Sequence, residues 1–160
     1  MMSPALFILG AFVVGFATGL RAFTPIALLS WVAVWGWMPL GGSRLAFLGT
    51  TVGGTIVAVL AVGELIGDKL TITPSRLTPG PLGGRVIMSS LAGAALAIGT
   101  GQWWILGMVS GVVGSIAGAF SGFHVRRAIV RGLGVADWLI AVLEDIITFS
   151  LVLLVLGLFF

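Results

Sequence analysis

VADWLIAVLEDIITFSLVLLVLGLFF, residues 135–160, is the stretch of this chain that most narrowly limits its fold. A transmembrane helix needs about 20 mostly apolar residues. This stretch exceeds that length, and residues 146–160 carry no charged side chain. Such a run predicts a helix that crosses a lipid bilayer. We therefore expect a membrane protein.

The rest of the composition has the same character. Of 160 residues, 59% are hydrophobic and 8% are charged, whereas about a quarter of a soluble domain is charged. So few polar side chains cannot cover a protein surface in water, which excludes a soluble core. The net charge of +3 comes with no run of basic residues, which argues against nucleic acid as a partner. Because cysteine is absent, disulfides, thiolate nucleophiles and thiolate metal sites are excluded.

We predict an all-α fold, a polytopic transmembrane helical bundle of about six spans. The predicted spans are Pro4–Leu20, Ala22–Leu40, Leu45–Gly63, Val86–Gly101, Trp103–Gly122 and Val135–Phe160. The first lacks the basic residues of a secretory signal, so we interpret it as a retained span. Arg21 and Gly101–Gln102 mark connections short enough to be tight hairpins. In an alternative, residues 4–38 form one kinked span with Arg21 at the membrane centre.

The basic residues predict an orientation. With six spans, Arg21, Lys69, Arg76, Arg85, Arg126, Arg127 and Arg131 fall on one side, and Arg44 falls on the other. Cytoplasmic loops carry the excess of Lys and Arg, so the first side is cytoplasmic and both termini are outside. Trp31, Trp35, Trp37, Trp103 and Trp104 lie near the outer face. Tryptophan favours the membrane interface, which agrees with this orientation.

The segment TITPSRLTPGPLGGR, residues 71–85, contains three prolines and three glycines. We interpret it as an extended cytoplasmic loop without regular helix. It divides a single integral-membrane domain, residues 1–160, into halves of three spans each, residues 1–70 and 86–160. Because three is odd, a 3+3 repeat would be inverted, as in many transporters. The sequence leaves both possibilities, a repeat and no repeat. The glycine pattern that both halves share lies at the ends of two spans that run in the same direction, which an inverted repeat would not give.

The acidic residues lie at or below the cytoplasmic ends of the predicted spans. Glu64 and Asp68 are four residues apart and therefore share one helix face. If the last span starts at Val135, Glu144 lies about 13 Å along it at 1.5 Å per residue. Asp137 is seven residues before Glu144, on the same face and closer to water. An ionised carboxylate at such depth is costly, so we expect it to face the bundle interior.

These acids and the bases on the same side suggest a site. The candidate residues for binding an ion or solute are Arg21, Glu64, Asp68, Lys69, His124, Glu144 and Asp145. Further possible partners of the acids on the same side are Arg76, Arg85, Arg126, Arg127 and Arg131. In one interpretation they form a polar, cytoplasm-facing cavity for an ion, a proton or a small polar solute. In the other they are structural ion pairs that join the spans.

The bases after the fifth span have more than one interpretation. Arg126, Arg127 and Arg131 are candidates for binding anionic lipid head groups. His124 is either a proton relay or metal ligand, or an interfacial histidine hydrogen-bonded to backbone. Because the chain has no second histidine, we predict no zinc-type metal site.

Glycine recurs at intervals of four residues. The repeats are Gly15-x3-Gly19, Gly49-x3-Gly53, Gly63-x3-Gly67, Gly107-x3-Gly111 and Gly114-x3-Gly118-x3-Gly122. Such faces allow helices to approach closely inside a bundle or at the seam of a homo-oligomer, which we expect here. We found no catalytic template, such as G-x-S-x-G, H-E-x-x-H or a phosphate loop. We therefore predict no enzyme activity and no cofactor.

Several motifs together resemble one family. They are GLRAFTP at residues 19–25, GELIGDKLTITPSRL at 63–77, His124 with its basic neighbours, and Leu143-Glu144-Asp145. The chain resembles a small bacterial inner-membrane family catalogued as a domain of unknown function, number four-one-two-six. The resemblance implies a compact multi-pass fold in the cell inner membrane. It marks Arg21, Glu64, Asp68, Lys69, His124, Glu144 and Asp145, and it brings no activity with it.

Our leading functional hypothesis is a small transporter or channel-like protein for an ion or small solute, in which proton coupling is one option. Glu144 and Asp145 would bind the cation or proton, Glu64 and Asp68 would form the cytoplasmic mouth, and Arg21 would balance their charge. The alternative is a lipid-binding or scaffold protein held together by structural ion pairs. A third hypothesis, an enzyme acting on lipid head groups, would need a nucleophile or metal beside His124. The expected partners are membrane lipids and further copies of the chain.

Overall fold

A computed structural model describes residues 3–68 and 77–160 of the chain. The described residues form six α-helices and one short 3-10 helix, with no strand among them. In chain order they are α1 (Pro4–Leu20), α2 (Thr24–Val34), η1 (Ala46–Gly49), α3 (Thr51–Gly67), α4 (Pro79–Gly99), α5 (Trp104–Leu133) and α6 (Asp137–Phe159). The predicted all-α fold is confirmed. Lys69 and Arg76 lie outside the described residues.

Three helices are long and apolar enough to cross a membrane. They are α4, α5 over Trp104–Gly132, and α6, with 21, 29 and 23 residues. The helices α1, α2 and α3 are apolar but shorter, with 17, 11 and 17 residues. By length and composition the chain is thus a helical membrane protein.

The second and third helices are shorter than the predicted spans. The predicted span Ala22–Leu40 is wrong at both ends, because α2 covers only Thr24–Val34. Gly36 has a positive φ of 81°, which takes the chain out of helical geometry soon after α2. Likewise, α3 begins at Thr51 because the hydroxyl of Thr50 accepts the N–H of Gly53 at 3.1 Å and caps the helix.

The fourth and fifth helices are longer than predicted. α4 begins at Pro79, so the prediction of a non-helical segment as far as Arg85 is wrong from residue 79 onward. Proline fits the first turn of a helix because those N–H groups have no intrahelical partner. α5 continues past the predicted end at Gly122 to Leu133, where Gly134 ends it with a left-handed φ of 62°. Residues 69–76 of the predicted loop lie outside the described residues.

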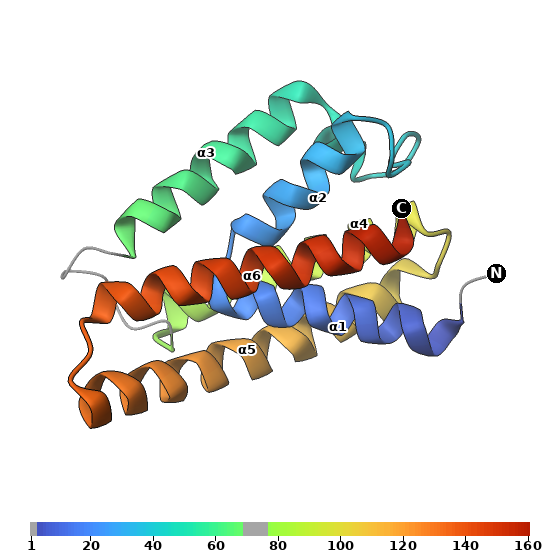
Figure 1. The fold of residues 1–160 in the computed structure, drawn as a ribbon. Helices are drawn as coiled ribbons and strands as arrows, with labels where there is room; N and C mark the ends of the chain where they lie inside the picture. Colours follow the sequence, from blue (N-terminus) through green and yellow to red (C-terminus); the bar gives the residue numbers. More distant parts are fainter. Residues whose placement is uncertain (1–2, 69–76) are drawn as a thin grey trace.

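Successive helices reverse direction, and both chain ends lie at the same end of the bundle (Figure 1). α3 packs on α2 at one side of the molecule, and α5 packs on α1 and α4 at the other. The apolar core lies between them. Its fully buried side chains include Phe7 of α1, Leu29 of α2, Leu96 of α4 and Val152 of α6.

Glycines bring α5 against the backbones of α1 and α4. A Cβ added at Gly15 would overlap the carbonyl oxygen of Gly111, and one at Gly118 would overlap that of Phe16. The predicted close packing is thereby confirmed for α1 and α5. On α3, no described residue of the chain approaches Gly63 or Gly67, since a Cβ at either position would meet open space, so these two glycines do not pack inside the bundle.

Candidate functional site

Charged residues from all parts of the bundle gather at the end where α1 finishes and α2 begins. We call this group the ionic cluster. Its members are Arg21, Glu64, Asp68, Arg85, Arg126, Asp137, Glu144 and Asp145. The group contains all five acidic residues of the chain.

Arg21 is the most deeply buried member, with 0% of its surface exposed. Its Nη1 donates to Asp68, its Nε lies 2.6 Å from Oδ1 of Asp145, and its Nη2 donates to the carbonyl of Ala141 at 3.0 Å. Arg21 itself occupies the break between α1 and α2, where the chain turns back (Figure 1). This agrees with the predicted hairpin at Arg21 rather than with one kinked helix over residues 4–38.

Glu64 and Arg85 stabilise the backbone at the same break. The two carboxylate oxygens of Glu64 accept the N–H groups of Ala22 and Phe23 at 2.7 and 2.9 Å. These donors directly precede α2, which has no side-chain cap of its own. From α4, the Nε of Arg85 donates to the carbonyl of Gly19 at 3.0 Å, near the end of α1. Both side chains thus satisfy backbone groups that the helix ends leave open.

Arg126 joins three carboxylates. Its guanidinium donates to both oxygens of Asp137 at 2.8 and 2.6 Å, to Asp68 at 3.1 Å and to Glu144 at 3.2 Å. We named Arg126 both as a possible partner of the acids and as a lipid head-group candidate, and in the structure it lies in the ionic cluster. The sequence contained a signal for this position, since Arg126 is four residues beyond Gly122 in the series Gly114-x3-Gly118-x3-Gly122. Each step of four residues turns the side chain by about 40°, so two steps beyond Gly118 Arg126 is rotated from the face that meets α1 toward Asp68 of α3 and Glu144 of α6.

The acidic pair of α6 lies inside the bundle as predicted, but less deep. α6 starts at Asp137, so Glu144 lies about 10 Å along the helix rather than about 13 Å. Glu144 is buried and shares the inner face of α6 with Ala141 and Thr148. The side chain of Asp137 is 61% exposed and forms the outer edge of the cluster.

Five of the seven candidate residues meet in the cluster. They are Arg21, Glu64, Asp68, Glu144 and Asp145. His124 does not join them: it is exposed, and its Nδ1 lies 2.7 Å from the carbonyl oxygen of Phe120. The predicted alternative, a histidine bonded to backbone, describes it. Lys69 lies outside the described residues. The other three members are Arg85 and Arg126, which we had named as possible partners of the acids, and Asp137, to which we had assigned no role.

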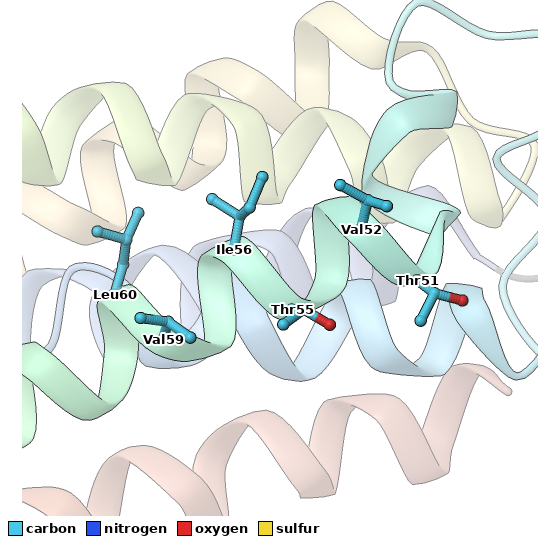
Figure 2. Close-up of a pocket in the computed structure, with 6 residues that line it drawn as sticks. All are labelled: Thr51, Val52, Thr55, Ile56, Val59 and Leu60. Atoms are coloured by element: carbon cyan, nitrogen blue, oxygen red, sulfur yellow. The ribbon is translucent and has the colours of Figure 1, made fainter.

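Two further observations bear on ligands. In residues 3–68 and 77–160, no group of three or more His, Asp or Glu side chains is arranged to hold a metal ion. A shallow apolar groove runs along the outer face of α3, as Figure 2 shows. It is lined by Thr51, Val52, Thr55, Ile56, Val59 and Leu60. The groove belongs to the opposite end of α3 from Glu64 and Asp68, so it is separate from the ionic cluster.

The chain belongs to the family described as Domain of unknown function (DUF4126), whose model matches residues 8–159. This match confirms the resemblance seen in the sequence motifs. Comparison with curated proteins and with solved structures found no match.

Proposed function

We propose that this member of the family is a multi-pass transporter or channel-like protein for a small ion or solute, and that the ionic cluster closes one end of its pathway. The observation that carries the proposal is the placement of the cluster. Five carboxylates and three guanidinium groups lie at one end of an otherwise apolar bundle. Ionisable groups inside a membrane bundle are costly and usually mark a pathway.

In this proposal the chain crosses the membrane six times. The alternating helix directions and the shared end of both termini support an even number of crossings (Figure 1). α2 spans only about 16 Å, and the segment after it would complete the second crossing. Its side chains Met38 and Leu40 are buried against protein. Irregular backbone is tolerated at membrane depth where protein covers it.

The charges support an orientation with the ionic cluster at the cytoplasmic side. Arg21, Arg85, Arg126, Arg127 and Arg131 lie at the end of the bundle that holds the cluster. Arg44 follows α2 at the other end, where Trp35, Trp37 and Trp103 are exposed. An excess of arginine marks the cytoplasmic side, and exposed tryptophan favours an interface.

The cluster has the form of a gate between α3 and the rest of the bundle. Asp68 of α3's C-cap is shared between Arg21 and Arg126, and Glu64 of α3 lies 3.8 Å from Arg85 of α4. A proton or cation arriving at one of these carboxylates would weaken its hold on a shared arginine. The end of α3 would then separate from α5, which is a two-state change of the kind that gating requires.

The test is ion flux in proteoliposomes, with proton, sodium and potassium gradients imposed in turn. The variants Glu144→Gln and Asp145→Asn keep the side-chain size and remove the charge. We expect flux to fall by at least about tenfold, because the buried charges that define the pathway are lost. Arg44→Gln is the control, since Arg44 is exposed and lies outside the ionic cluster. Unchanged flux in both acidic variants, with the proteins inserted, would overturn the proposal.

A second candidate is a non-transporting scaffold or lipid-binding protein in which the cluster is structural. The contacts of Glu64 favour this candidate. Both of its carboxylate oxygens accept backbone N–H groups, which is a structural role. Thermal unfolding in detergent separates the two candidates. If the protein is a scaffold, the Glu144→Gln and Asp145→Asn variants should be less stable than the native protein. Vesicles that contain the native protein should then show no more ion flux than vesicles without protein.

A further inference from the structure

The last turns of α5 present basic side chains on two different faces. At about 100° per residue, His124, Arg127 and Arg131 fall within about 60° of one another, and Arg126 is turned away from them by about 100–160°. These three residues are exposed, whereas Arg126 is partly buried in the ionic cluster. Neither Arg127 nor Arg131 forms an ion pair with a described residue. We call His124, Arg127 and Arg131 the basic face.

The basic face continues an apolar face of the same helix. Val113, Ile116 and Phe120 are 54%, 42% and 44% exposed and lie on the side of α5 that His124 also occupies. The exposed surface therefore changes from apolar to basic after Phe120. A change from apolar to basic side chains is typical of the point where a transmembrane helix passes from the hydrocarbon layer into the head-group layer.

The length of α5 agrees with that placement. Trp104 opens the helix and is 48% exposed. From Trp104 to His124 the helix rises by about 30 Å, which is the thickness of the hydrocarbon core. With Trp104 at one interface, His124 lies at the other. Arg127 and Arg131 then extend about 4 and 10 Å further, into the head-group layer.

The histidine adds a defined hydrogen-bonding group. A carbonyl oxygen only accepts, so the contact with Phe120 places the ring proton of His124 on Nδ1. Nε2 is not used by that contact, and in the protonated ring it donates. The two guanidinium groups can each bind a phosphate through paired N–H donors.

We propose that the basic face, His124, Arg127 and Arg131, is a docking surface for the phosphate head groups of anionic phospholipids. This inference does not depend on the proposed transport function. It differs from the sequence-based prediction in two residues, since His124 joins the surface and Arg126 leaves it for the ionic cluster.

The experiment measures the thermal unfolding midpoint in mixed micelles that contain either phosphatidylglycerol or phosphatidylcholine. A ligand that binds the folded state raises the midpoint. We expect phosphatidylglycerol to raise it for the native chain. The combined variant His124→Gln, Arg127→Gln and Arg131→Gln should lose more than about half of that rise, because the cationic partners of the head group are gone. Arg44→Gln, an exposed arginine at the opposite end, should keep the full rise.

Three outcomes would overturn the proposal. The first is a full rise in the combined variant, and the second is an equal loss in Arg44→Gln, which would indicate a general effect of charge. The third is a rise of the same size with inorganic phosphate in place of lipid. If the combined variant fails to fold, the double variant Arg127→Lys, Arg131→Lys takes its place, because lysine keeps the charge but not the paired N–H donors. If the double variant keeps only part of the rise in the unfolding midpoint, head-group binding is supported. If it keeps the whole rise, a role for the paired guanidinium donors is contradicted.

Discussion

The two outermost helices, α3 and α5, are attached to the bundle in different ways (Figure 1). α5 lies against α1 and α4 along most of its length, with Gly107, Gly111 and Gly118 against carbonyl oxygens of the neighbouring helices. α3 packs on α2, and its far end is held by the carboxylates of Glu64 and Asp68. The first attachment depends on close backbone packing, whereas the second combines apolar packing on α2 with ion pairs at one end of α3.

The two kinds of contact differ in how easily they can be rearranged. Close backbone packing cannot be loosened without separating two helices, since no flexible side chain lies between them. Ion pairs can exchange partners, and Asp68 already contacts two arginines. We therefore infer that α5 belongs to the rigid part of the bundle and that the end of α3 is the part able to move.

The largest expected effect comes from valine in place of glycine on α5. Gly118→Val would place a Cβ against the backbone carbonyl of Phe16, and we expect no monodisperse folded protein in detergent because the backbone must shift. Gly63→Val on α3 is the matched control, since a Cβ there meets open space. Size-exclusion chromatography and circular dichroism measure both. Equal behaviour of the two variants would contradict the contrast between the helices.

The next effect comes from the centre of the ionic cluster. Arg21→Met removes a fully buried guanidinium from the partly buried carboxylates of Asp68 and Asp145, and we expect a loss of about 3–5 kcal/mol in stability. Arg44→Gln serves as the reference because Arg44 is exposed. The free energy of unfolding in detergent is the measurement. A loss below about 1 kcal/mol, the usual value of a surface pair, would show that charge does not hold α3.

The smallest expected effect concerns the stability of the end of α3 alone. Asp68→Asn weakens the contacts with Arg21 and Arg126, so the free energy of local opening at the end of α3 should fall by about 1–3 kcal/mol. Amide hydrogen exchange should speed up in the last turns of α3 and stay unchanged in α5. Faster exchange in both helices would mean that they open as one unit, against the inference of separate roles.

The glycine faces show how far the sequence could predict the packing. Repeats at intervals of four predicted close approach, which the chain itself supplies for α1 and α5 but not for Gly63 and Gly67. A repeat states only that a helix can be approached. Which neighbour approaches depends on the arrangement of all the helices, and that arrangement is not a local property.

The charged residues divide in a similar way. Arg21, Glu64 and Glu144 were predicted to meet because charges avoid hydrocarbon and collect at one end. His124 and Arg126 were both named as possible partners of the acids, but only Arg126 meets them, because two residues of separation turn a side chain by about 200° on a helix. α4 and α5 also extended into stretches that local signals, prolines at 79 and 81 and the glycine at 122, suggested were not helical.

What this sequence determined by itself is the solvent, the helical class and the end of the bundle that carries charge. Each of these follows from how the individual residues partition between lipid and water, so composition and order are enough. The tertiary structure decided which arginine meets which carboxylate. It also decided that ion pairs hold the end of α3 and that close backbone packing at glycines holds α5. Those outcomes depend on the rotation of each helix about its axis and on how closely neighbouring backbones approach.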